Sequence, residues 1–301
     1  MTNAQDWIDA TRERLMSGHQ EQLNRLKDNY IAGSGTMSFE FSINSIRPGS
    51  IISIGTSTFY VWEVNTNLNS ATVQGAWDNT LDMDFDAESI VRISPRFTDS
   101  QILRALNDDL NDLCSPTNGL FQIATAELSY DATKTGYDLS AAYGIISPIE
   151  LRIEGVGDYK DWPRIPSHKY RILKGAPTGA EGFESGMALF IYDSTFTNGD
   201  IVHMTYKKGF RHVSGSYSSK SATGLPNTAW DLPPLGAAIS LMAGRDIKRT
   251  FIESQGDPRR AAEVAPGTSY DSVKGLRVQR QQRIEAEKQR LDAFYPAIKD
   301  A

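Results

Sequence analysis

The spacing of apolar and polar residues changes several times along the chain, so helical and strand-rich stretches alternate. From about Ala4 to Tyr30, apolar residues recur at three- and four-residue steps, the spacing of an amphipathic helix. The apolar stripe is thin, because Gly18 and His19 interrupt it. A helix with so few apolar positions gains little by folding alone. We therefore expect an N-terminal helix in residues 1–36 that another molecule covers.

Residues 37–95 change to a strand-like period. Apolar residues alternate with polar ones at 39–43, and short apolar runs follow at 51–55, 58–64, 71–77 and 89–94. Tight turns such as RPGS separate the runs. Four or five short strands in so short a stretch predict a small β-barrel of the SH3-like size class.

The stretch TDSQILRALNDDLNDL predicts the clearest helix of the chain. Thr98 and Gln101 form a capping-box pair ahead of a continuous leucine and isoleucine face. Another helical pattern begins near two consecutive prolines, which a first helical turn tolerates. We expect these helices, within residues 96–119 and 225–258, to form a helical core.

Residues 120–224, between the two central helices, are again rich in strands. Short runs with β-branched and aromatic residues are separated by Gly, Pro, Asn and Asp. The sequence TNGD at 197–200 lies between two apolar runs and predicts a hairpin. We expect an inserted β-sandwich of about six strands. The fold class is therefore α+β: a helical core, a small N-terminal β-barrel, an inserted β-sandwich and a long C-terminal helix.

Residues 259–301 predict a C-terminal arm and a charged helix from Asp271 to Tyr295. Residues 245–290 hold eleven Lys and Arg against seven Asp and Glu, whereas the whole chain has a net charge of −6. This basic excess suits contact between subunits better than wrapping of nucleic acid, and a purely solvated face is the alternative. The candidate residues for a partner interface are Arg259, Arg260, Arg277, Arg280, Arg283, Leu276, Ile284, Leu291, Phe294 and Tyr295.

The composition of the 301 residues, 40% hydrophobic and 23% charged, is ordinary for a globular protein. No apolar run approaches the roughly 18 residues that a membrane span needs. The N-terminus does not resemble a signal peptide. Cys114 is the only cysteine, so we expect no internal disulfide and folding in a reducing cytoplasm.

Motifs for catalysis or for cofactor binding are not found in the sequence. The four histidines are far apart, and neither a GxSxG nor a Walker A motif occurs. The carboxylates of Asp82, Asp84 and Asp86 would share one face of an extended segment. A calcium loop, however, needs glycine where Ala87 stands and glutamate where Ile93 stands. We expect no catalytic residue, cofactor or metal, and favour a solvated acidic edge while leaving a cation site open.

Several aromatic residues of the predicted sandwich could stack on sugars. They are Tyr130, Tyr137, Tyr143, Trp162 and Tyr170, and packing in a core or an interface is the more frequent role of such residues. The alternative function is therefore a tail or baseplate protein whose β-sandwich binds host carbohydrate.

The last third of the chain resembles virion proteins of tailed bacteriophages. The resemblance lies in GLPNTAWDLPPLGAA (224–238), RRAAEVAPGT (259–268) and LRVQRQQRIEAEKQRLDAFYP (276–296). The segment PRFTDSQILRALNDDLNDL, followed by GLF, is similar to their internal helix. Among these proteins, the chain is most similar to head-to-tail connector (adaptor or neck) proteins. The β content of this chain departs from the small, mostly helical connectors.

The resemblance implies a structural protein rather than an enzyme. It implies a homo-oligomeric ring, about twelve-fold, that bridges the phage portal protein and a tail or other neck protein. The ring would line the DNA passage, with transient contact to DNA that is not sequence-specific. The expected location is the head–tail junction of a virion assembled in the host cytoplasm, with no contact to a membrane.

Overall fold

The computed structural model describes residues 3–15, 21–134, 136–139, 144–178, 183–192, 196–253 and 268–295. In these residues the protein is α+β, with four α-helices and three antiparallel sheets. The chain divides into two compact units. The first unit comprises Met1–Asp112 with Arg211–Glu285, and the second comprises Leu113–Phe210 with Ala286–Ala301. None of the described helices is long and apolar enough to cross a membrane.

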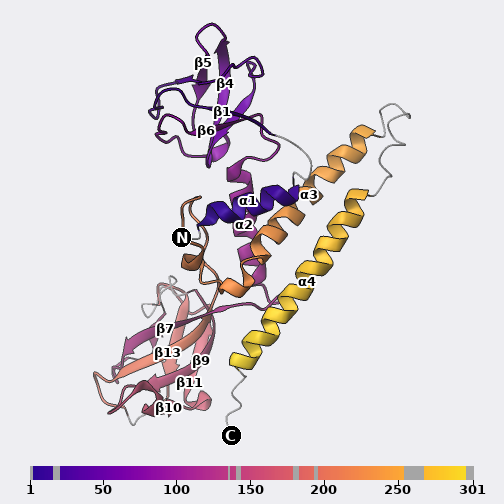
Figure 1. The fold of residues 1–301 in the computed structure, drawn as a ribbon. Helices are drawn as coiled ribbons and strands as arrows, with labels where there is room; N and C mark the ends of the chain where they lie inside the picture. Colours follow the sequence, from indigo (N-terminus) through magenta and orange to yellow (C-terminus); the bar gives the residue numbers. More distant parts are fainter. Residues whose placement is uncertain are drawn as a thin grey trace. The chain divides into compact units, whose positions relative to one another are not determined.

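The N-terminal helix, α1, spans Ala4–Leu15 and packs against α3, which spans Leu232–Glu253 (Figure 1). Trp7 and Ile8 are buried, with 2% and 0% of their surface exposed. The apolar stripe of α1 is therefore covered by the same chain, and the prediction that another molecule covers it is wrong. The predicted helix is also too long, because Gln22–Arg25 forms a strand.

The second helix, α2, spans Asp99–Leu113 and begins with the predicted capping box. The Gln101 N–H donates to Thr98 Oγ1 at 3.2 Å, and the Thr98 N–H donates to Gln101 Oε1 at 3.4 Å. Helices α2 and α3 touch at Gly236, where an added Cβ would lie 1.6 Å from Oδ1 of Asp109. The glycine therefore permits a close approach of the two helices.

Near the N-terminus, a six-stranded antiparallel sheet of the described residues curls strongly into a half-barrel (Figure 1). Its strand order is β1-β6-β3-β4-β5-β2, and a bridge between Leu26 and Phe39 links its two edges. The sequence predicted this module to start at residue 37, but β1 and the first residue of β2, Thr36, precede that point. The strands are β1 (Gln22–Arg25), β2 (Thr36–Ser38), β3 (Ile51–Ile54), β4 (Ser57–Asn65), β5 (Ser70–Gln74) and β6 (Ile90–Ile93).

Aromatic rings fill the inside of the half-barrel. Phe59 is fully buried, and the ring centroids of Tyr30 and Phe85 lie 5.2 Å and 6.2 Å from its own. Both pairs have the edge-to-face geometry that aromatic quadrupoles favour. Tyr30 therefore belongs to this core rather than to the predicted N-terminal helix.

Most of the second unit is built from two further antiparallel sheets. One has the order β10-β9-β13-β7 and the other β11-β12-β8. Buried residues of both sheets, such as Leu151, Leu189 and Val202, belong to one hydrophobic cluster. The strands are β7 (Gln122–Ser129), β8 (Tyr137–Asp138), β9 (Ile145–Ile153), β10 (Arg164–Ile165), β11 (Tyr170–Lys174), β12 (Met187–Ile191) and β13 (Ile201–Lys208).

The predicted hairpin at 197–200 is wrong. A turn is present, because the Asp200 N–H donates to the Thr197 carbonyl at 3.1 Å. However, β12 pairs with β8 and β11, whereas β13 pairs with β7 and β9. The turn therefore precedes a strand of the other sheet, because pairing with distant strands decides the sheet to which each strand belongs.

The C-terminal helix, α4, spans Thr268–Phe294, close to the predicted bounds. Its sequence is mostly charged, yet Val273, Ile284 and Leu291 are buried. These three apolar residues of α4 therefore find contacts within their own chain.

Candidate functional site

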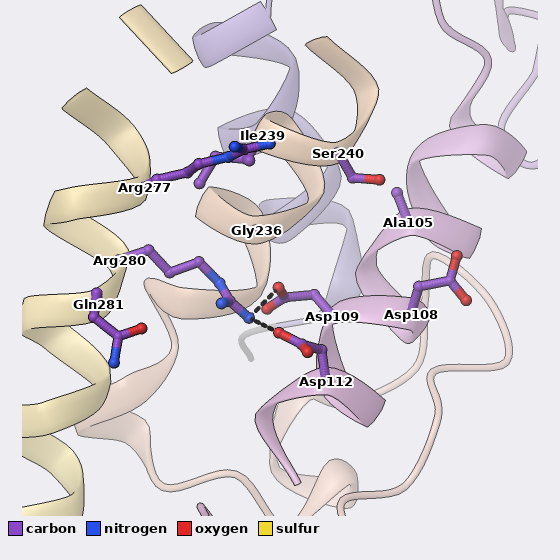
Figure 2. Close-up of a pocket in the computed structure, with 10 residues that line it drawn as sticks. All are labelled: Ala105, Asp108, Asp109, Asp112, Gly236, Ile239, Ser240, Arg277, Arg280 and Gln281. Atoms are coloured by element: carbon purple, nitrogen blue, oxygen red, sulfur yellow. Dashed lines mark hydrogen bonds and ion pairs between the residues drawn. The ribbon is translucent and has the colours of Figure 1, made fainter. Parts of the chain in front are cut away.

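A charged cavity of about 450 Å³ lies between α2, α3 and α4 in the first unit (Figure 2). Aspartates of α2 face arginines of α4 across it. Figure 2 shows Asp109 and Asp112 directed at Arg280, whereas Asp108 points away. The residues that line the cavity are Ala105, Asp108, Asp109, Asp112, Gly236, Ile239, Ser240, Arg277, Arg280 and Gln281.

Arg280 binds two carboxylates of α2 at once. Its Nη2 lies 2.6 Å from Oδ1 of Asp109 and 2.7 Å from Oδ2 of Asp112. The two aspartates are three residues apart, so they lie on the same side of the helix. The Asp109 side chain is 7% exposed and that of Asp112 is 53% exposed. Arg280 therefore joins one buried and one solvated carboxylate.

Asp109 is a buried charge with incomplete compensation. Burial raises its pKa to about 7, and the positive charge of Arg280 opposes this increase. Its Oδ2 is buried and has no hydrogen-bond partner among the described residues. Removing a carboxylate from water is costly unless it is paired, so the contact with Arg280 offsets part of that cost.

The free energy of unfolding should contain a contribution from Asp109 that decreases as the pH rises. The pKa of an aspartate in an unfolded chain is close to 4, whereas that of folded Asp109 is about 7. Between these values the folded state holds the extra proton, so the contribution is present below about pH 4 and is lost as the pH rises through 7. The loss should reach at most about 4 kcal/mol.

Chemical denaturation at about pH 5 and about pH 8 measures this contribution. Asp109→Asn is the matched control, because an amide of the same shape does not titrate. The free energy of unfolding of the wild type should fall more between the two pH values than that of the variant. The same pH dependence in both proteins would contradict the prediction.

Another arginine fixes α4 beside the first. The Nε of Arg283 lies 2.8 Å from Oδ2 of Asp231, and its Nη2 donates to Oδ1 at 3.0 Å. The same Nη2 also donates to the Thr228 carbonyl at 2.7 Å. Such a two-pronged contact sets orientation as well as charge. Both partners are partly exposed, so this pair contributes less to stability than a buried one.

Apolar contacts complete the attachment of α4 in the first unit. Val273 is 5% exposed and forms a cluster with Leu235 and Ile239 of α3. Met242 and Leu276 pack against this cluster. Arg280 in the cavity, together with Arg283 and the apolar contact of Val273 outside its lining, thus holds this part of α4 in place.

The ten residues predicted for a partner interface fall into three groups. Arg280 and Arg283 pair with carboxylates of the same chain, and Leu276, Ile284 and Leu291 are buried or half-buried. Arg277, Phe294 and Tyr295 are exposed. Arg259 and Arg260 lie outside the described residues. Contact with a partner stays a prediction, and it concerns the exposed group most directly.

Sequence reasoning missed the acidic half of this site. Asp109 lies three residues after Leu106 and four before Leu113, on the apolar side of α2. A carboxylate on the apolar face of a helix is the signal that could have found it. The partner of Asp109 could not have been found in this way, because Arg280 is far away in the sequence.

The acidic segment 82–88 stabilises a turn of the half-barrel. Asp82 accepts hydrogen bonds from the Gly33 N–H at 2.9 Å and the Tyr30 hydroxyl at 3.2 Å. Asp84 accepts from the Ala32 N–H at 2.7 Å. Burial, followed by the charge of Asp82, raises the pKa of Tyr30 to about 12. Among the described residues, no group of three or more potential ligands could hold a metal ion.

The aromatic residues predicted to stack on sugars in the second unit are mostly packed inside it. Tyr130 and Tyr137 are 9% and 7% exposed, so they pack in the core, which is the role that the sequence favoured over stacking on sugars. Tyr170 is half-buried against the same cluster, and the Trp162 ring lies 4.5 Å from that of His203. Tyr143 lies outside the described residues.

Comparisons of this chain with family models, with curated proteins and with solved structures found no match. The function therefore has to be argued from the sequence patterns and from the contacts described above. The half-barrel and the two further sheets enter that argument as architecture alone, because fold does not imply function.

Proposed function

We propose that this protein is a structural subunit of a tailed-bacteriophage virion at the head–tail junction. It would form a ring that bridges the portal protein and a tail or neck protein, with DNA passing through. The observation that carries the proposal is the resemblance of residues 224–238 and 276–296 to phage connector proteins. These residues form the start of α3 and most of α4.

Exposed residues of α4 support the proposal, because they offer contacts to a partner. In the first unit Val278 is 53% exposed and Arg277 is also exposed, and in the second unit Phe294 is 68% exposed and Tyr295 is also exposed. Exposed aromatic and aliphatic residues next to arginine are the composition of protein interfaces. The contacts of Arg280 and Arg283 fix the orientation of the helix in the first unit, so Arg277 and Val278 are presented without a further ordering cost.

A ring also needs a second, different surface, because neighbouring subunits meet head-to-tail. The half-barrel has several exposed apolar residues that suit this role. Leu23, Leu81 and Ile90 are 55%, 75% and 52% exposed, and Met83 is 47% exposed. We assign the contact between ring subunits to this group and the contact with the portal protein to α4.

The change Val278→Asp should abolish incorporation into virions without unfolding the protein. The Val278 side chain is 53% exposed, so the free energy of unfolding should change by less than about 0.5 kcal/mol. Electron microscopy of the purified protein should show rings. Complementation of a phage lacking the gene should be at least about tenfold weaker with the variant than with the wild type. Arg171→Glu, at an exposed position of β11, is the control and should complement normally.

Normal complementation by Val278→Asp would contradict the role of α4. A purified protein that stays monomeric at every concentration, and is absent from virions, would contradict the proposed function itself.

A further inference from the structure

An exposed cluster of three aromatic side chains lies on the half-barrel. The ring centroids of Tyr60 and Trp62 are 4.8 Å apart, and those of Tyr60 and Trp77 are 4.7 Å apart. Trp62 is 56% exposed, and the other two side chains are only partly buried. Large aromatic side chains gain most free energy when they are buried. Three of them together at a surface therefore indicate a contact with something outside the chain.

A β-bulge lies at Trp62 in strand β4. Val61 pairs with Val73 and Glu63 pairs with Thr72, so Trp62 is the extra residue of β4. A bulge disrupts the ladder locally and re-aims a side chain. Val61 before the bulge is fully buried and Val64 after it packs against the same core. The bulge therefore leaves two consecutive residues, Trp62 and Glu63, together at the surface.

A strained turn holds Trp77 on the other side of Tyr60. Ala76, just before the short helix η1 (Trp77–Asn79), and Asp78, within it, have left-handed backbone conformations, with φ of 52° and 57°. Such conformations cost free energy in residues other than glycine and persist only where neighbours impose them. Arg104 binds the Asp78 carboxylate at 2.8 Å, and the Thr80 hydroxyl donates to the Trp77 carbonyl at 2.7 Å.

A polar cavity of about 400 Å³ lies along the β4–β5 hairpin, and its lining begins at Glu63, the residue after Trp62. Ser70 and Thr72 line the cavity, and Gln74 follows on the same face of β5 because alternate residues of a strand share a face. The Trp62 Nε1 donates to Gln74 Oε1 at 3.2 Å, which joins the rings to the polar row. Among the described residues that line the cavity, Glu63 is the one ionisable group; the others are Val64, Asn65, Thr66, Asn67, Ser70 and Thr72.

We propose that this surface of the half-barrel binds a neutral oligosaccharide. A sugar ring has an apolar C–H face, which stacks on Trp62, and a rim of hydroxyls. The hydroxyls, amides and single carboxylate of the cavity hydrogen-bond with that rim, which fixes the orientation of the sugar.

The lining of the site disfavours two other ligand classes. Single-stranded nucleic acid also stacks on aromatic rings, but its phosphates need a positively charged groove, and this cavity has none among its described residues. Proline-rich peptides dock in grooves lined by aromatic residues, whereas here a polar cavity adjoins the rings. The site is independent of α4 and of ring formation.

The proposal is tested by measuring binding of the full-length protein to a panel of neutral tetrasaccharides. These are built from glucose, galactose, mannose or N-acetylglucosamine. At least one tetrasaccharide should bind saturably in the range of about 0.1–10 mM. Trp62→Ala should weaken that binding at least about tenfold, and Thr72→Val should weaken it about threefold. Tyr217→Ala, which removes an 89% exposed ring outside the site, is the control and should bind like the wild type.

Both Trp62→Ala and Tyr217→Ala remove exposed rings, so an unchanged thermal transition confirms that each variant is folded. The proposal is overturned if no tetrasaccharide binds at about 10 mM, or if Trp62→Ala binds as well as the wild type. It is also overturned if only a thymidine decanucleotide or a proline-rich peptide binds in a manner that requires Trp62.

Discussion

Replacing Arg280 with glutamine should destabilise the first unit by about 3 kcal/mol near pH 8. Removing one partner of a buried ion pair leaves an uncompensated charge, and Asp109 is 7% exposed with Arg280 at 2.6 Å. Asp112 loses the same partner, but its side chain is 53% exposed and water replaces the contact. The expected loss therefore arises almost entirely at Asp109, and chemical denaturation of the two proteins measures it.

Two variants distinguish this explanation from a general loss of charge. In the Asp109→Asn background, Arg280→Gln should cost less than about 1 kcal/mol, because no buried carboxylate remains. Arg283→Gln removes an arginine that faces Asp231 at the partly exposed pair, and it should also cost less than about 1 kcal/mol. Near pH 5, where Asp109 is protonated, the loss for Arg280→Gln should shrink. Equal losses for Arg280→Gln and Arg283→Gln would show that burial of Asp109 is not the cause.

The parts of the structure that the local sequence decides were predicted well. The capping pair of Thr98 and Gln101 begins α2 as expected, and the leucines that follow form its buried face. The prolines 233 and 234 lie in the first turn of α3. A cap, a first-turn proline and a helical repeat all act over three or four residues, so short windows of sequence contain the whole signal.

Where distant pairing decides the structure, prediction failed. Leu26 and Tyr30 continue the helical spacing of the N-terminus, yet both belong to the core of the half-barrel. Gln22–Arg25 pairs with Ile90–Ile93, which lies far along the sequence. The residues of a short strand can match a helical period by chance, and only the pairing partner resolves the ambiguity.

The candidate site shows the same division. Arg280 and Arg283 were recognised as charged groups capable of pairing, because arginines are visible on a helix. Their partners lie far away in the sequence, Asp109 on α2 and Asp231 just before α3, so sequence spacing could not connect them. The sequence therefore suggested a contact with a neighbouring molecule for side chains whose contacts in the structure are within the chain.

Replacing Gly236 with alanine should destabilise the first unit by at least about 2 kcal/mol, although alanine favours a helix. The added Cβ would lie 1.6 Å from Oδ1 and 2.2 Å from Cγ of Asp109. The Asp109 carboxylate cannot move away cheaply, because it is buried and held by Arg280. Either the helices α2 and α3 separate or the ion pair breaks, and each outcome costs more than the helix propensity returns. Differential scanning calorimetry should show a lower transition temperature.

Gly275→Ala is the matched control, because Gly275 lies in α4 and an added Cβ there meets nothing within 4 Å. It should stabilise the protein by about 0.5–1 kcal/mol, the ordinary gain from replacing a helical glycine. In the Asp109→Ala background the clash is absent, so Gly236→Ala should lose most of its cost. If Gly236→Ala instead raises the transition temperature as Gly275→Ala does, then α2 and α3 do not approach each other closely at Asp109, and the charged cavity is not built as described.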